Sequence, residues 1–202
     1  TRGLQSDVLN AVQSLVHVRD DVEQPTWLGP DAPCPAREVI AAPNGLFRLA
    51  DLAKGGAELG DPSPNFFSSN ALDFNIVPNV PEPVGWMAFL QSLFATDPSS
   101  IDHLQELFGY LVSSETSLQK IFLLIGPPRS GKGTIARVLR ALLNPFSTIA
   151  PTLASLGSHF GLWQFIGKSV AVIGDARLGS RTDKATALER LLSISGEDAV
   201  SV

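Results

Sequence analysis

The stretch that decides the fold is Gly126-Pro127-Pro128-Arg129-Ser130-Gly131-Lys132-Gly133-Thr134, here called the phosphate loop. It follows an apolar run at residues 121–125 and precedes a helical pattern at residues 134–143. A strand, a glycine-rich turn with a lysine and a helix, in that order, are typical of a loop that holds phosphate groups. Glycines let successive backbone N–H groups point inward, and the helix start adds the positive end of its dipole. The pattern predicts that residues 126–134 bind a nucleoside triphosphate.

The spacing of the loop fits G-x-x-x-x-G-K, with Lys132 as the lysine. Gly133 stands where a hydroxyl residue is usual, and Thr134 supplies the hydroxyl one position later. The five consecutive apolar residues before the loop predict a fully buried strand. After the loop, apolar residues such as Ile135 and Leu139 recur at helical spacing. The alternative is a packing turn that binds nothing, but such a turn needs no lysine among its glycines.

A second carboxylate-bearing position follows a second apolar segment. Residues 169–173 predict a buried strand, and Asp175 comes two residues after it. Phosphate-loop enzymes place a carboxylate there to hold Mg²⁺, directly or through water, against the triphosphate. We therefore expect Lys132 and Asp175 to be the catalytic residues, and Thr134 and Asp175 to contact Mg²⁺. The alternative for Asp175 is a cap on the following turn.

Other charged residues of this half have weaker assignments. Arg177 and Arg181 are candidates for contacts with phosphate, and exposed arginines of this kind are commonly just solvated. No glutamate stands beside Asp175 to orient an attacking water, and Glu189 and Glu197 are candidates by proximity in sequence alone.

The pattern outside the loop predicts an α/β protein of two domains. Helical spacing recurs at residues 4–16, 86–93 and 101–111, and Asp97-Pro98-Ser99-Ser100 is a helix-start signature. Pro43-Asn44-Gly45 between short apolar pieces indicates a hairpin. Trp86 and the phenylalanines near it could form a base-stacking platform, although their helical spacing favours the core. Strands and helices alternate after the loop, which indicates a parallel sheet with covering helices.

Composition sets limits on the class of protein. The 202 residues carry a net charge of −5, with 44% hydrophobic residues. Residues 1–120 hold 6 basic and 15 acidic side chains, and residues 121–202 hold 9 and 5, so the half with the loop is basic. Apolar stretches are far shorter than the ~20 residues of a membrane span, and the single cysteine, Cys34, excludes an internal disulfide. We expect a cytoplasmic protein without a membrane partner, and a segment of a longer chain.

Several segments beyond the loop carry a resemblance to a known family. They are residues 44–46, 66–72, 104–110 and 117–120 before the loop, and residues 167–178 and 191–198 after it. Together with the loop, they resemble the helicase part of phage, plasmid and poxvirus-type primase–helicases, in superfamily three of the AAA+ class. The resemblance implies an accessory N-terminal domain over residues 1–116, mainly helical with short strands. Residues 117–202 are then the N-terminal part of a P-loop AAA+ domain, whose parallel sheet is incomplete at the C-terminus.

The resemblance also implies an activity. Such proteins are ring-forming, in general hexameric, ATPases that unwind duplex DNA at the origin of a mobile element. ATP would bind at residues 126–134 and Asp175 would hold Mg²⁺, whereas Gly174 stands where many relatives have a second acid. The basic hairpin that contacts DNA, the polar sensor and the arginine finger are expected beyond Val202. Two alternatives remain: a non-catalytic ATP-binding assembly module, and a nucleoside monophosphate kinase, which would normally begin with its phosphate loop.

Overall fold

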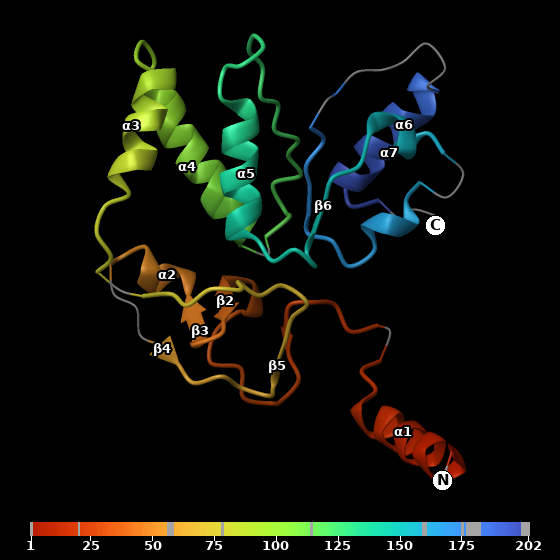
Figure 1. Ribbon diagram of the computed structural model, residues 1–202. Helices are drawn as coiled ribbons and strands as arrows, with labels where there is room; N and C mark the ends of the chain where they lie inside the picture. Colours follow the sequence, from red (N-terminus) through yellow and green to blue (C-terminus); the bar gives the residue numbers. More distant parts are fainter. Residues whose placement is uncertain are drawn as a thin grey trace.

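The computed structural model describes residues 2–19, 21–55, 59–77, 79–113, 115–158, 161–174, 176 and 183–198. Within these residues the chain is mixed α/β, with seven α-helices and short strands in three small sheets. Figure 1 shows the small antiparallel sheets and the main group of helices as neighbouring parts of the molecule, with the first helix projecting away from both. The predicted boundary between residues 116 and 117 stays a prediction.

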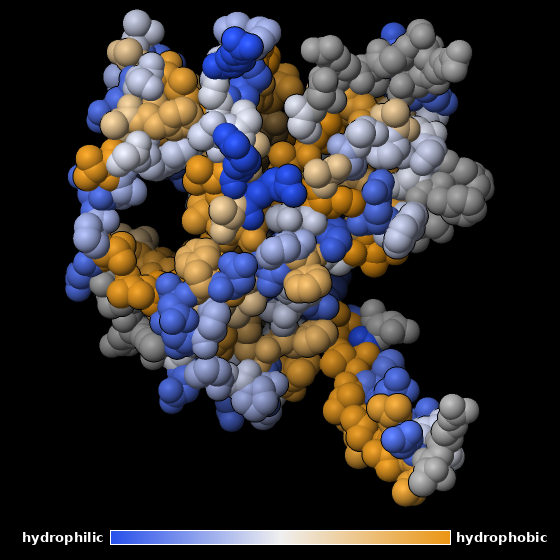
Figure 2. Space-filling view, in the orientation of Figure 1, coloured by the Kyte–Doolittle hydropathy of each residue, from blue (hydrophilic) through white to orange (hydrophobic). Residues whose placement is uncertain are grey.

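The first helix, α1 (Arg2–Val16), confirms the helical spacing of its residues. Its apolar side chains are nevertheless exposed, as Leu4, Val8 and Leu15 show. Figure 2 shows apolar residues along the projecting helix. Periodicity therefore predicted the helix, but among the described residues nothing covers its apolar face.

Two small antiparallel sheets follow. Strand β1 (Thr26–Trp27) pairs with β5 (Phe66–Phe67), and β2 (Val39–Ala42), β3 (Gly45–Arg48) and β4 (Leu59–Gly60) form a sheet in that order. A 3₁₀ turn, η1 (Ala36–Glu38), precedes β2, and the short helix α2 (Leu49–Leu52) follows β3. The predicted turn before Gly45 is confirmed, because Ala42 faces Gly45 across the hairpin. The Asn44 side-chain amide donates to the Ile76 carbonyl at 2.8 Å and accepts from the Ile76 N–H at 3.1 Å. These two hydrogen bonds fix the hairpin to the segment before the main helices.

The main core lies among three helices, α3 (Val84–Leu93), α4 (Ser99–Val112) and α5 (Lys132–Leu142), here called the helical cluster. Figure 1 shows them side by side. Their buried side chains are Leu90, Ile101, Leu104, Leu107 and Ile135. The predicted start of α4 is confirmed, since the Asp97 carboxylate accepts hydrogen bonds from the Ser99 and Ser100 hydroxyls, both at 2.6 Å.

The apolar run at residues 121–125 differs from its prediction. All five residues are exposed, Leu123 to 71% and Ile125 to 85%, and none of them belongs to a strand, so the expected buried strand is wrong. The parallel sheet that would receive it consists of β6 (Thr148–Ile149) and β7 (Val170–Ala171), paired over two positions. A strand satisfies its backbone groups only against a neighbour, and two residues offer a very short edge.

The remaining elements pack around a second small core. Helix α6 (Leu153–Leu156) and the 3₁₀ turn η2 (Trp163–Phe165) lie between β6 and β7 in the chain, and α7 (Lys184–Ser195) follows β7. Helices α6 and α7 are in contact, and the core between these elements contains Leu156, Leu162 and Ala187. Val170 of β7 packs against Leu139 and Leu143, which joins the parallel sheet to the helical cluster. Across the described ranges, each helix is too short or too polar to cross a membrane.

Candidate functional site

The phosphate loop ends in the first turn of α5. Gly131 precedes this helix with a left-handed φ of 79°, a conformation that glycine adopts at little cost. Its carbonyl accepts hydrogen bonds from the N–H groups of Thr134 and Ile135, at 2.9 and 3.0 Å. Ile135 is buried in the helical cluster, so the end of the loop is fixed to the main core. The helix begins at Lys132, two residues before the predicted pattern.

Lys132 turns back into the loop. Its Nζ donates to the carbonyls of Gly126 and Pro127, at 2.7 and 2.8 Å, and to the Ser130 hydroxyl at 3.0 Å. An ammonium group has three donors, so these bonds use its full capacity. Pro128 and Arg129 form the turn of the loop beyond this group. The ammonium therefore lies inside the curve of the loop, where an anion that entered would meet its charge.

The segment of chain that contains the loop is positively charged. Residues 121–174 contain five basic side chains and no acidic one. Arg129 of the loop and Arg137 of α5 are exposed, and the Arg137 guanidinium donates to the Thr134 hydroxyl at 3.1 Å. Gly133 is exposed and has open space around it. The uninterrupted positive charge, together with the start of a helix, favours binding of an anion.

The other half of the predicted site lies outside the described residues. Asp175, the predicted Mg²⁺ ligand, is not among the described residues, and neither are Arg177 and Arg181. The parallel ladder extends as far as Val172, whose N–H donates to the Ile149 carbonyl at 2.8 Å. Among the described residues there is no cluster of histidine, cysteine, aspartate and glutamate that could hold a metal. Thr134 is thus the one predicted metal contact whose place is known.

The two glutamates considered as catalytic bases, Glu189 and Glu197, make no hydrogen bond to the phosphate loop. Glu197 accepts a hydrogen bond from the Thr116 hydroxyl, and the neighbouring Gly196 carbonyl accepts one from the Gln119 amide at 3.0 Å. Glu189 is an exposed residue of α7. The structure therefore gives neither side chain a hydrogen bond to the loop.

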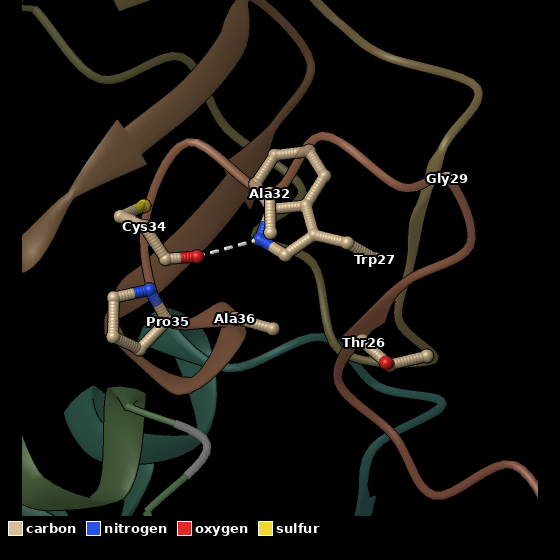
Figure 3. Close-up of a pocket in the computed structure, with 7 residues that line it drawn as sticks. All are labelled: Thr26, Trp27, Gly29, Ala32, Cys34, Pro35 and Ala36. Atoms are coloured by element: carbon tan, nitrogen blue, oxygen red, sulfur yellow. Dashed lines mark hydrogen bonds between the residues drawn. The ribbon is translucent and has the colours of Figure 1, made fainter.

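A separate hollow of about 450 Å³ lies between β1 and η1. Figure 3 shows its lining, where the Trp27 indole N–H donates to the Cys34 carbonyl at 2.8 Å. Partial burial raises the pKa of the Cys34 thiol, which keeps it protonated at neutral pH. This hollow holds no ionised side chain among its lining residues and offers no evident chemistry.

Two residues beside the loop were not predicted to be part of the site. Phe89 and Leu93 of α3 line a hollow of about 570 Å³ together with Arg129, Gly131, Gly133, Thr134 and Arg137. The sequence places Phe89 on the core face of its helix, and it does pack against the helical cluster. Its second contact, with a loop about forty residues later, has no signal in the local pattern.

Comparison with models of known protein families and with curated proteins gives no match for this chain. The assignment of function therefore rests on the loop and on the resemblance carried by its flanking segments.

Proposed function

We propose that the chain binds Mg-ATP on the phosphate loop and is the ATP-binding part of a DNA helicase of the primase–helicase type. In the whole protein, a ring of subunits would couple ATP hydrolysis to the unwinding of DNA. One observation carries the proposal: the Lys132 ammonium lies inside the curve of residues 126–134, directly at the start of α5. A phosphate group bound in this curve would replace the loop carbonyls as the acceptor of hydrogen bonds from Lys132 Nζ.

The fold supports the proposal at one point and departs from it at another. Strands β6 and β7 are parallel, with Thr148 opposite Val170, as in the sheet of a P-loop AAA+ domain. The apolar run at residues 121–125 would be a third strand of that sheet, and it is unpaired.

Mg²⁺-dependent ATP hydrolysis, measured with and without DNA, tests the proposal. We expect Lys132→Ala and Asp175→Asn to lower the rate by about 100-fold, since in the proposed complex Lys132 would contact the phosphates and Asp175 would hold the metal. Arg140→Ala is the matched control, because Arg140 is an exposed cation of α5 that does not line the hollow beside the loop. Its rate should equal that of the wild type.

The same assays distinguish the alternatives. ATP binding without hydrolysis, on this chain and on a longer one, would favour the assembly module. Transfer of phosphate to a nucleoside monophosphate would favour the kinase. If ATP does not bind at all, each of these functions is wrong.

A further inference from the structure

The hollow beside the phosphate loop is formed where α3 meets the start of α5. The contact is close: a Cβ atom built on Gly131 would lie 2.6 Å from Leu93 Cδ1 and 3.1 Å from Phe89 Cζ. Two apolar side chains of α3 therefore press on the glycine that begins α5. The hollow lies beside this contact, is widely open to solvent and has a volume of about 570 Å³.

Phe89, the aromatic residue that lines the hollow, is held in place by neighbouring rings. The Trp86 ring stacks on Phe89 with centroids 5.5 Å apart and an interplanar angle of 28°, and stacks on Phe108 at 5.9 Å and 24°. These rings pack against the buried core of the helical cluster. Phe89 is itself half-buried, and part of its surface lines the hollow. A ring fixed in this way can receive a planar ligand without losing much side-chain entropy.

The other side chains that line the hollow are polar or positive. They are Arg129, Thr134 and Arg137, and the lining includes no acidic side chain. Gly131 and Thr134 belong both to this hollow and to the phosphate loop, so the two sites are continuous. The apolar lining residues thus suit a planar ring, and the polar and positive ones suit the ribose or phosphates attached to it.

We propose that this hollow holds the nucleoside end of the bound nucleotide, with the base against Phe89 and Leu93. The inference rests on the proposed binding of a triphosphate at residues 126–134. It makes Phe89 a residue that discriminates a nucleotide from a bare polyphosphate.

The test compares ATP with inorganic tripolyphosphate, which carries the phosphates but no nucleoside. Affinities are measured by calorimetry on the wild type and on Phe89→Leu and Phe89→Ala. Stacking of a base on an aromatic side chain contributes enough that its loss should weaken ATP binding by about tenfold. Tripolyphosphate binding should change by less than about twofold in both variants. Phe89→Leu retains an apolar contact with Gly131, so it reports on the ring itself even if Phe89→Ala unfolds.

Two controls separate this inference from the proposed function. Phe94→Ala removes a ring that packs on the same core but does not line the hollow, and it should leave both affinities unchanged. Lys132→Ala should weaken both ligands. If Phe89→Leu weakens both ligands equally, or neither, while Lys132→Ala weakens both, the nucleoside site is wrong and the phosphate site stands. If the wild type binds neither ligand, both are wrong.

Discussion

The helical cluster and the apolar run at residues 121–125 have similar side chains and opposite surroundings. Leu90 of α3 is fully buried, whereas Leu123 of the run is 71% exposed. The two regions flank the phosphate loop: the run enters it, and α5 of the helical cluster leaves it. One end of the loop is therefore fixed to a core, and the other end is held by the bonds of Lys132 to Gly126 and Pro127.

The difference shows what burial requires beyond apolar composition. A helix satisfies its own backbone groups and needs only a surface on which to place one face. A strand needs a neighbour with free backbone groups before its side chains can be buried. The cluster has three helices that bury one another, whereas the two-residue ladder of β6 and β7 leaves the run without a partner among the described residues.

The largest expected effect comes from a matched pair of leucine substitutions. Leu90→Ala should lower the free energy of unfolding by about 2–5 kcal/mol, because it leaves a cavity in the core. Leu123→Ala should change it by less than about 0.5 kcal/mol, since its side chain is already in water. Urea unfolding of the two variants measures both values. A loss of similar size in Leu123→Ala would mean that the run is buried and the comparison fails.

A second pair tests the fixed end of the loop. Gly131→Ala should destabilise the fold by about 1–2 kcal/mol, because of the left-handed φ, with a further cost from the contact with Leu93. Gly133→Ala should stabilise α5 by up to about 1 kcal/mol, since it has open space and a helical backbone. Thermal unfolding under identical conditions compares them. Equal effects would contradict the close approach of α3 to Gly131.

The smallest effect is a dependence of stability on pH that comes from Asp97, just before α4 of the helical cluster. Hydrogen bonds from Ser100 and then Ser99 hold the pKa of Asp97 below its usual value. A carboxylate whose pKa is lowered by folding stabilises the protein above the unfolded pKa, about 3.9, and this contribution is lost as the pH falls through the folded pKa. The residues of the apolar run cannot titrate.

The variant Asp97→Asn isolates this contribution. The midpoint temperature of its thermal unfolding should lie below that of the wild type at pH 6. The difference between the two midpoints should narrow as the pH approaches 3. Ser100→Ala, which removes the main cause of the lowered pKa, should show a weaker dependence than the wild type. A difference in midpoint between Asp97→Asn and the wild type that stays constant from pH 6 to pH 3 would show that the Asp97 charge does not contribute to stability.

The sequence predicted the parts of the fold that depend on local pattern. Spacing placed Ile101, Leu104 and Leu107 on the buried face of α4, and the hairpin turn before Gly45 follows from its residue types. What failed depends on partners distant in the chain. Five apolar residues look the same whether or not a neighbouring strand exists, so the exposure of the run had no signal. The contact of Phe89 with the loop is equally non-local, whereas the absence of acidic residues from 121–174 was visible in the sequence and indicates the anion site.

Titration of Mg-ATP into the wild type and into Lys132→Ala tests the central claim most directly. The wild type should show saturable binding, and Lys132→Ala should lose at least about tenfold in affinity, because the charge inside the loop is removed. Arg140→Ala should bind as the wild type does. Equal affinity of the wild type and Lys132→Ala would contradict the account, since the nucleotide would then bind somewhere other than the phosphate loop.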